Sequence, residues 1–152
     1  MIHLAIVQHN KTETTMLKHS PADFNNMQTG GLSDLLGLEI VAVEERAIKA
    51  RLAIKPHHLA ANGYLHAATV VMLADTACGY GCIANLPEGA QSFTTIELKS
   101  NHLGTAREGW LHCVATPAHL GRNTQVWDAT VSNEAGKTVA LFRCTQMVLW
   151  PK

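Results

Sequence analysis

Charge is scarce in this sequence, and neither sign is in excess. Only 16% of the 152 residues are charged, against about 25% in an average soluble domain. Its 12 basic residues balance 12 acidic ones, so it lacks the basic excess of a nucleic-acid-binding protein and we predict no nucleic-acid partner. Disorder is excluded as well, because 47% of the residues are hydrophobic. A chain so poor in charge is expected to cover part of its surface by self-association.

Several motifs of catalysis and targeting are also absent. The sequence has no Gly-x-Ser-x-Gly elbow, no phosphate-binding glycine loop and no His-Glu-x-x-His spacing, so we predict neither a metal nor a cofactor. The four cysteines lack Cys-x-x-Cys spacing and are expected to be buried thiols. No signal-peptide pattern and no apolar run near the roughly 20 residues of a membrane span is found. We therefore expect a cytoplasmic protein without a membrane partner.

What is present is the pattern of one α+β domain. Residues 1–29 are weakly patterned and are predicted to form a variable N-terminal arm, helical near residues 12–18, before a domain at 30–152. A short helix closed by glycine is expected at 31–37. Strands are predicted at residues 38–45, 47–54, 92–103, 110–116, 124–132 and 138–150, with turns at 104–109, 117–121 and 133–136. One long, apolar helix at 66–84 stands between the second and third strands, which predicts a sheet wrapped around a helix.

Asp75 is the only charged residue between positions 67 and 84. The predicted helix is apolar or small nearly all round, so we expect it to be buried. Burying an unpaired carboxylate costs several kcal/mol or raises its pKa. Asp75 is therefore either a hydrogen-bonded structural carboxylate or a catalytic base or nucleophile.

The segment before the helix supports the catalytic interpretation. Residues 62–68 form a glycine-containing turn that leads into the helix, and the first amides of a helix attract negative charge. Such charge develops on the carbonyl oxygen of an attacked ester or thioester. Ala67 and Asp75 are eight residues apart, or about 12 Å along one helix, so one carbonyl group cannot contact both. If both residues act on the same carbonyl, two copies of the chain must supply them.

A known family shows a similar order of residues. Gly63, His66, Ala67 and Ala68, with Asp75 nine residues after His66, resemble the His-Gly-Gly…Asp signature of hotdog-fold thioesterases, above all the phenylacetate-degradation (PaaI-like) type. The similarity extends over roughly residues 30–150, with glycines at the family's later turns. It implies a hotdog fold, in which an antiparallel sheet wraps around one central helix. It also implies hydrolysis of an acyl-CoA thioester by a dimer or a dimer of dimers.

The resemblance implies a role for each matching residue. Asp75 is implied as the nucleophile or the base that activates water, and the Ala67 amide as the oxyanion donor. Thr95 is implied to place a hydroxyl near the attacking water, and His66 to shape the helix start. The residues implied in substrate binding are Gly63, His66, Ala68, Gly121 and Arg122. Among these, Arg122 is a plausible partner for a CoA phosphate.

The sequence departs from the family pattern at two places, and these keep alternatives open. Ala67 and Ala68 replace the two glycines; alanine keeps the amide, although its methyl group crowds the carbonyl. The family's Asn or Gln falls at Ala60, and Asn62 is the nearest substitute. One alternative is a hotdog protein that binds an acyl ligand without hydrolysing it. Another is a dehydratase of 3-hydroxyacyl thioesters with His66 as base, although no hydratase signature is recognisable.

Overall fold

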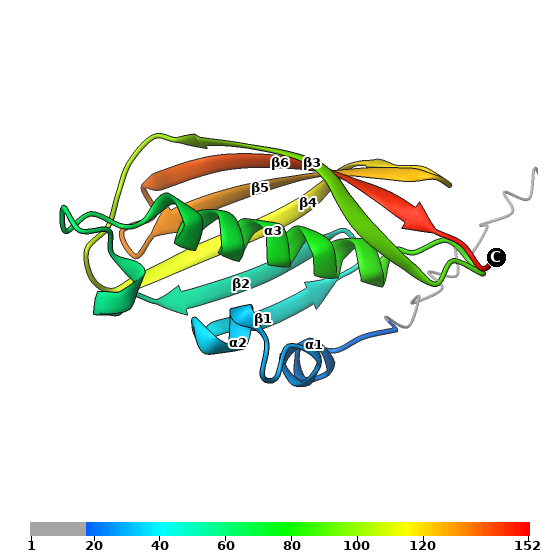
Figure 1. The fold of residues 1–152 in the computed structure, drawn as a ribbon, viewed down its shortest axis with the longest axis horizontal. Helices are drawn as coiled ribbons and strands as arrows, with labels where there is room; N and C mark the ends of the chain where they lie inside the picture. The colour runs from blue at the N-terminus through cyan, green and yellow to red at the C-terminus, as the bar shows by residue number, and fades with distance from the viewer. Residues whose placement is uncertain (1–17) are drawn as a thin grey trace, which may run out of the picture.

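A six-stranded antiparallel sheet carries one long helix against one face in the computed structural model, which describes residues 18–152 (Figure 1). The helix predicted near residues 12–18 lies almost wholly outside the described residues. The strands are β1 (Leu38–Glu44), β2 (Ala47–Ala53), β3 (Ser92–His102), β4 (Trp110–Leu120), β5 (Thr124–Asn133) and β6 (Thr138–Leu149). The helices are α1 (Pro21–Met27), α2 (Leu32–Leu35), the 3-10 turn η1 (Pro56–His58) and α3 (Ala67–Ala84). This arrangement confirms the predicted α+β sheet wrapped around a helix.

The strand order β1-β2-β4-β5-β6-β3 places β3 at one edge of the sheet. β3 pairs along its length with β6, and Thr95 lies opposite Gln146. Its other edge has no strand beside it among the described residues. Leu98 lies opposite the fully buried Cys144, so both point to the core side of the sheet, yet Leu98 is 44% exposed. An apolar side chain that faces the core but remains exposed at a sheet edge indicates a surface that another chain can cover.

Helix α3 is the centre of the core. It is long and apolar enough to cross a membrane, but 56% of it is buried within the domain, as in the core helix of a soluble fold. Gly81 lets the helix approach the sheet closely, because a Cβ there would lie 2.5 Å from the ring of Trp127. All four cysteines are free and buried, which confirms the expectation of buried thiols. Burial raises the pKa of Cys113 to about 12, so this thiol stays protonated.

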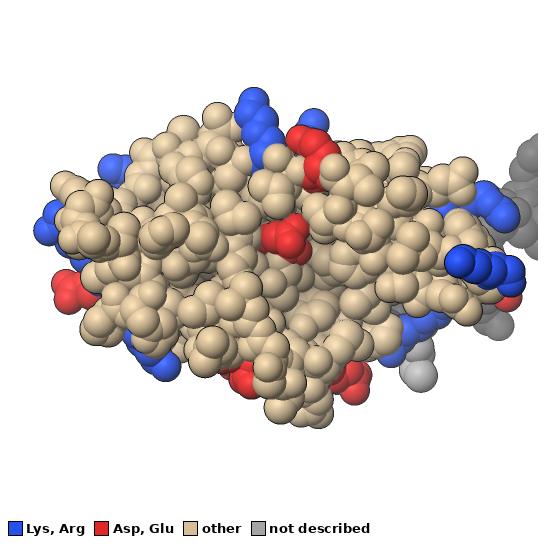
Figure 2. Space-filling view, in the orientation of Figure 1, with Lys and Arg blue, Asp and Glu red and all other residues tan. Residues whose placement is uncertain are grey.

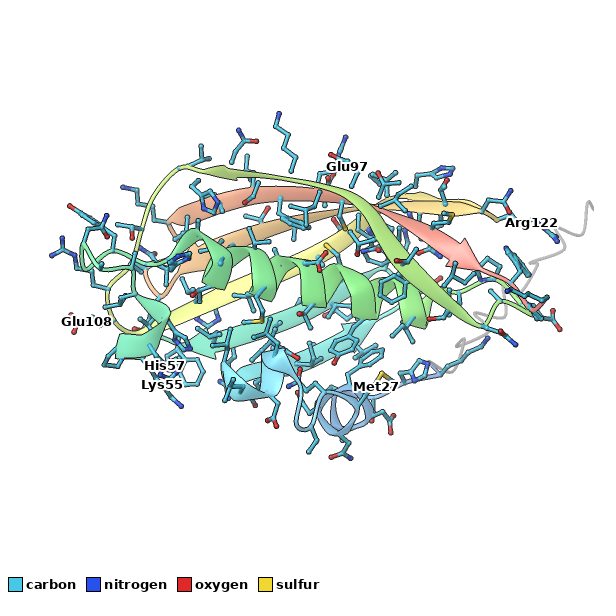
Figure 3. The ribbon with its side chains drawn as sticks, viewed as in Figure 1. Met27, Lys55, His57, Glu97, Glu108 and Arg122 are labelled. Atoms are coloured by element: carbon cyan, nitrogen blue, oxygen red, sulfur yellow. The ribbon has the colours of Figure 1, made fainter. Side chains whose placement is uncertain are left out.

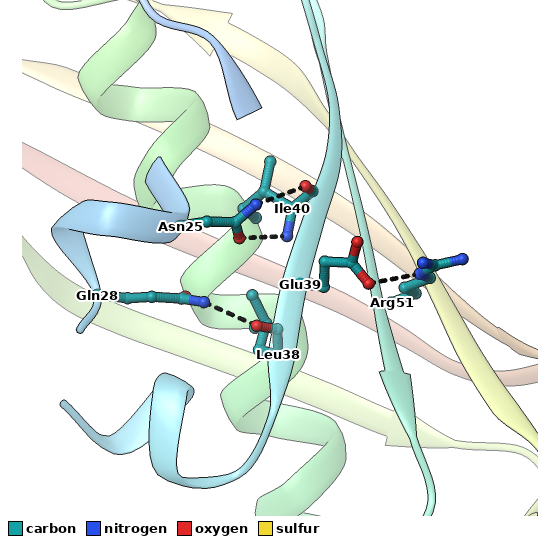
Figure 4. Close-up of polar contacts among 6 residues, drawn as sticks. All are labelled: Asn25, Gln28, Leu38, Glu39, Ile40 and Arg51. Carbon is teal, nitrogen blue, oxygen red and sulfur yellow. Dashed lines mark hydrogen bonds and ion pairs between the residues drawn. The ribbon is translucent and has the colours of Figure 1, made fainter. Parts of the chain in front are cut away.

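The described part of the predicted arm packs onto the domain. Ser20 caps α1 through a reciprocal hydrogen-bond pair with Asp23, and Phe24 of α1 is fully buried in the core. The Asn25 side chain exchanges two hydrogen bonds with the backbone of Ile40, as Figure 4 shows. Residues 21–27 thus pack against β1 and stabilise it. The short glycine-closed helix is confirmed as α2, followed by Gly37 at φ +77°.

One predicted turn was wrong. Residues 117–121 do not form a turn, because β4 continues to Leu120 and Pro117 lies opposite Trp127 of β5. The β2 strand pairs with β4 only as far as Ala115. The missing N–H of Pro117 therefore falls where β4 has no second neighbour, beside a register shift that absorbs the proline.

Candidate active site

The start of α3 leaves one backbone donor unused. His66 is the N-cap residue, and its Nδ1 accepts a hydrogen bond from the Ala68 amide at 3.0 Å. The His66 carbonyl accepts from the Thr69 amide at 3.0 Å. The amide of Ala67 donates to no acceptor within residues 18–152, and Ala67 is exposed. An open N–H thus lies at the positive end of a long helix, where it can bind an anionic oxygen.

A buried histidine fixes this helix start in place. The carbonyl of His58 accepts hydrogen bonds from the His66 amide at 2.9 Å and from the Thr69 hydroxyl at 3.1 Å. The His58 ring bonds to the Lys55 amide and the Leu36 carbonyl, each at 2.9 Å. Burial lowers the pKa of His58, which keeps the ring neutral and able to accept from Lys55. His58 is fully buried, although it lies in the loop between β2 and α3.

Asn62 and Gly63 shape the loop that precedes α3. The Asn62 side-chain oxygen accepts a hydrogen bond from the Tyr64 amide at 3.1 Å, and Gly63 adopts φ +78°, which favours glycine. The guanidinium of Arg107 lies 4.6 Å from the centre of the Tyr64 ring. Asn62 is exposed, and its described contact closes its own turn. The structure therefore does not bring Asn62 to Asp75.

Asp75 lies in the middle of α3 with one carboxylate oxygen unsatisfied. Its Oδ1 is buried and has no hydrogen-bond partner in the described part of the chain. Burial raises the pKa of the Asp75 carboxyl. The Thr95 hydroxyl lies beside this carboxyl, but it donates its proton to Gln146. The face that carries α3 is largely uncharged, with an acidic side chain in a hollow near its middle (Figure 2). A structural carboxylate would be expected to have both oxygens satisfied, so the geometry favours a functional group.

Sequence reasoning missed a residue beside this carboxylate. Gln146 of β6 is fully buried, and its Oε1 accepts a hydrogen bond from the Thr95 hydroxyl at 2.8 Å. Its Nε2 donates to the sulfur of Cys144 at 3.2 Å. The signal was available, because Cys144, Gln146 and Val148 are alternate residues of an apolar strand and the amide stands at an inward position. A buried amide needs partners, and here one of them is a candidate site residue.

Gly121 and Arg122 lie at the other end of the molecule. The β4–β5 turn that holds them is tied to the C-terminal end of α3, since Gln125 donates to the Asn85 carbonyl at 2.8 Å. Arg122 stacks over the ring of Trp150 at 4.5 Å, and Figure 3 places it at the opposite end from His57. The 18 residues of α3 span about 27 Å. Within one chain these two residues are therefore far from the Ala67 amide.

The structure thus separates two groups of candidate site residues in each chain. One is the open Ala67 amide at the helix start, and the other is the Asp75 carboxyl with Thr95 and Gln146. Ala67 and Asp75 both lie on the continuous helix α3, about 12 Å apart along its axis, so no single carbonyl group can contact both within one chain. The amide can stabilise an oxyanion, and the carboxyl can accept a proton or attack a carbonyl carbon.

Comparison with known proteins finds a matching family model and similar hydrolases. The model of the "Thioesterase superfamily" matches residues 62–140. A 1,4-dihydroxy-2-naphthoyl-CoA hydrolase of Listeria monocytogenes is 31% identical over 115 residues, covering 76% of this chain and 93% of that protein.

Two solved structures of similar proteins define the fold. A mutant thioesterase from Pseudomonas aeruginosa superposes with a TM-score of 0.84 at 28% identity, covering 88% of this chain and 96% of the other. The PaaI protein of the Escherichia coli phenylacetic acid degradation operon superposes with a TM-score of 0.70 at 26% identity, covering 77% and 83%. Together with the antiparallel sheet around α3, these neighbours confirm the predicted hotdog fold and the PaaI-like resemblance.

Proposed function

Because this chain belongs to the thioesterase superfamily and is a thioester hydrolase, we propose that it cleaves acyl-CoA thioesters to a free acid and CoA, with Asp75 as nucleophile or general base. The observation that carries this proposal is the half-buried Asp75 carboxyl, which has an unsatisfied oxygen and a hydroxyl beside it. Burial raises its pKa and so makes its carboxylate a stronger base than an exposed aspartate.

In the general-base route, a water beside Asp75 attacks the thioester carbonyl carbon. The carboxylate takes one proton from the water as the new C–O bond forms, and the carbonyl oxygen becomes an oxyanion. An Ala67 amide donates to that oxyanion. The intermediate then collapses, the C–S bond breaks, and the departing CoA sulfur takes the proton from Asp75. In the nucleophile route, the Asp75 carboxylate attacks the carbonyl carbon, the C–S bond breaks and CoA leaves as the thiolate. Water then hydrolyses the acyl anhydride to the free acid and Asp75, and a proton released in that step goes to the thiolate. After a single turnover in ¹⁸O water, label in the Asp75 carboxyl identifies the nucleophile route, because the general-base route places ¹⁸O only in the free acid.

We infer that each complete site uses two copies of the chain. The support is the edge of β3 that has no neighbouring strand within residues 18–152, on which Ile96 is 53% exposed and the core-facing Leu98 is 44% exposed. Antiparallel pairing of the β3 edges of two chains relates the chains by a two-fold axis, so that α3 of the partner runs in the opposite direction. The Ala67 amide of the partner then approaches Asp75, and the end that carries the partner's Arg122 turns toward the same helix start. A dimer, or a dimer of such dimers, follows.

Sedimentation at micromolar concentration tests this assembly directly. Wild-type chain is expected to sediment as a dimer or tetramer. Ile96→Arg, which places a charge on the exposed β3 edge, is expected to shift the protein toward monomer and to lower hydrolysis in parallel. Val41→Arg is a matched control, because Val41 is 40% exposed on β1 at the opposite sheet edge. A fully active monomer would contradict the two-copy site.

A panel of acyl-CoA thioesters tests the substrate class. The panel should contain short, long and aromatic acyl groups, including 1,4-dihydroxy-2-naphthoyl-CoA, since relatives from Listeria monocytogenes and Escherichia coli carry that substrate in their names. Release of free CoA thiol is the readout. We expect hydrolysis of at least one class by wild-type protein and its loss in Asp75→Asn. Tight binding of acyl-CoA without release of thiol by the wild-type protein would refute the proposed hydrolysis.

A further inference from the structure

Three polar side chains lie in a row across the buried face of the sheet. Thr95 of β3 is opposite Gln146 of β6, and Gln146 is opposite Gln125 of β5. Both glutamines are fully buried. Gln125 serves the far end of α3, because its amide donates to the Asn85 carbonyl at 2.8 Å and its oxygen accepts from Trp127 Nε1 at 2.9 Å. Gln146 instead serves Thr95, the hydroxyl beside Asp75.

The partners of Gln146 set the direction in which its amide points. Its Nε2 donates to the Cys144 sulfur at 3.2 Å, so its oxygen faces Thr95. Cys144 is in turn within hydrogen-bond reach of Cys78, and this contact, together with burial, raises the pKa of the Cys78 thiol. A threonine hydroxyl has one proton and can donate only once. That proton goes to the Gln146 oxygen at 2.8 Å, which leaves the lone pairs of the Thr95 oxygen for the site.

We propose that Gln146 is a positioning residue for hydrolysis: it holds the Thr95 hydroxyl as a hydrogen-bond acceptor, so that the attacking water donates one hydrogen to Thr95 and the other to Asp75. The inference rests on the proposed function of Asp75. With both hydrogens held, a lone pair of the water oxygen points away from the two side chains and toward the thioester carbonyl. Gln146 itself touches neither the water nor the substrate.

Loss of Gln146 has a distinctive consequence. The groups that face Asp75 are Cys78 from its own helix and Thr95 from β3, with Cys144 and Gln146 of β6 behind them. Without the Gln146 oxygen, the Thr95 proton is free to turn to the Asp75 carboxylate. A hydrogen bond to the charged form lowers the pKa of Asp75. The carboxylate then becomes a weaker base. Because Asp75 stays ionised at lower pH, the acid limb of the pH–rate profile moves to lower pH.

The experiment compares pH profiles of kcat/KM for thioester hydrolysis. Gln146→Met keeps an unbranched side chain of similar length but cannot replace the amide oxygen. We expect its acid limb to move down by about one pH unit, with a plateau about tenfold lower. Gln125→Met is the matched control, equally buried one strand away, and its acid limb should not move. In a Thr95→Val background, Gln146→Met should move nothing, because the hydroxyl proton is gone.

Each outcome supports or overturns the inference. An unmoved acid limb in Gln146→Met, an equal shift in Gln125→Met, or a shift that persists with Thr95→Val would overturn it. Should Gln146→Met not fold, Cys144→Ala removes the acceptor that orients the amide and is expected to shift the limb in the same direction. An unmoved limb there would likewise overturn the inference. Inactive wild-type protein would instead refute the proposed function. If the wild type is active and Asp75→Asn is inactive, a negative result with Gln146→Met concerns only the role of Gln146.

Discussion

Replacing Asp75 by Asn should abolish activity and stabilise the fold at the same time. The substitution keeps the shape of the side chain and removes its charge and basicity. A buried carboxylate oxygen with no partner is costly when ionised, whereas a neutral amide is less so. If Asp75 were retained for stability, the substitution would instead destabilise the fold and leave hydrolysis intact.

The sign of the stability effect follows from the raised pKa of Asp75. Burial raises the pKa of Asp75 in the folded chain above its ordinary value of 3.8. This group therefore favours folding most below pH 3.8, and that contribution is lost as the pH rises through the folded pKa. At neutral pH, Asp75→Asn should gain about 1 kcal/mol, the low end of the cost of a buried polar atom without a partner. For a domain of this size that gain raises the Tm by about 3 °C.

Two assays on the same preparations check the prediction. Release of free CoA thiol should fall by about 10³-fold, within the range for loss of a positioned base. Thermal unfolding should show a Tm difference that grows from about pH 4 to pH 7.5 as wild-type Asp75 ionises. Unchanged hydrolysis would refute the catalytic role. Reduced activity with a lower Tm would show that Asp75 supports the fold instead.

Three further substitutions have defined outcomes. Ala67→Pro removes the free amide, and proline is compatible with the first turn of α3 after the extended His66, so kcat should fall about 10²-fold with little change in Tm. Ala67→Gly keeps the amide and should stay active. An active proline variant would show that the Ala67 amide is not the oxyanion donor. Burial lowers the pKa of His58 below the ordinary histidine value of 6.5, so the stability of the wild-type protein should fall as the pH drops below 6.5. In thermal melts, the Tm of His58→Ala should depend less on pH than the Tm of the wild type. The same pH dependence of Tm in both proteins would contradict this prediction. Gly81→Ala should lower the free energy of unfolding by about 2 kcal/mol in denaturant, although alanine favours helices, because its Cβ would lie 2.5 Å from the Trp127 ring. A gain in stability would show that the ring can move.

The sequence could predict what depends on local pattern. Alternating strands and one long apolar helix specify the elements, and a single carboxylate inside that helix marks Asp75. An open amide at the start of α3 could also be predicted, because the first amides of a helix have no partner within the helix. The hypothesis of a two-copy site followed from the helix rise, since Ala67 and Asp75 are eight residues apart on the same helix.

Contacts between distant residues could not be predicted in this way. Thr95 and Gln146 are 51 positions apart, and only the register of β3 on β6 brings them together. The burial of His58 depends on the Leu36 carbonyl, 22 positions earlier. A single sequence shows that a polar residue occurs on an apolar strand, but not which side chain lies beside it.

Mixing two inactive variants tests the two-copy site most directly. In a dimer of Asp75→Asn with Ala67→Pro, one site combines the intact Asp75 of one chain with the intact Ala67 amide of the other, while the second site has lost both. Randomly reassociated 1:1 mixtures should therefore regain about a quarter of wild-type hydrolysis. Both changes on one chain, mixed with wild type, should leave the mixed dimers inactive. If each site lay within one chain, the two variants would restore nothing and the wild-type mixture would keep half of its activity; that result would contradict the account.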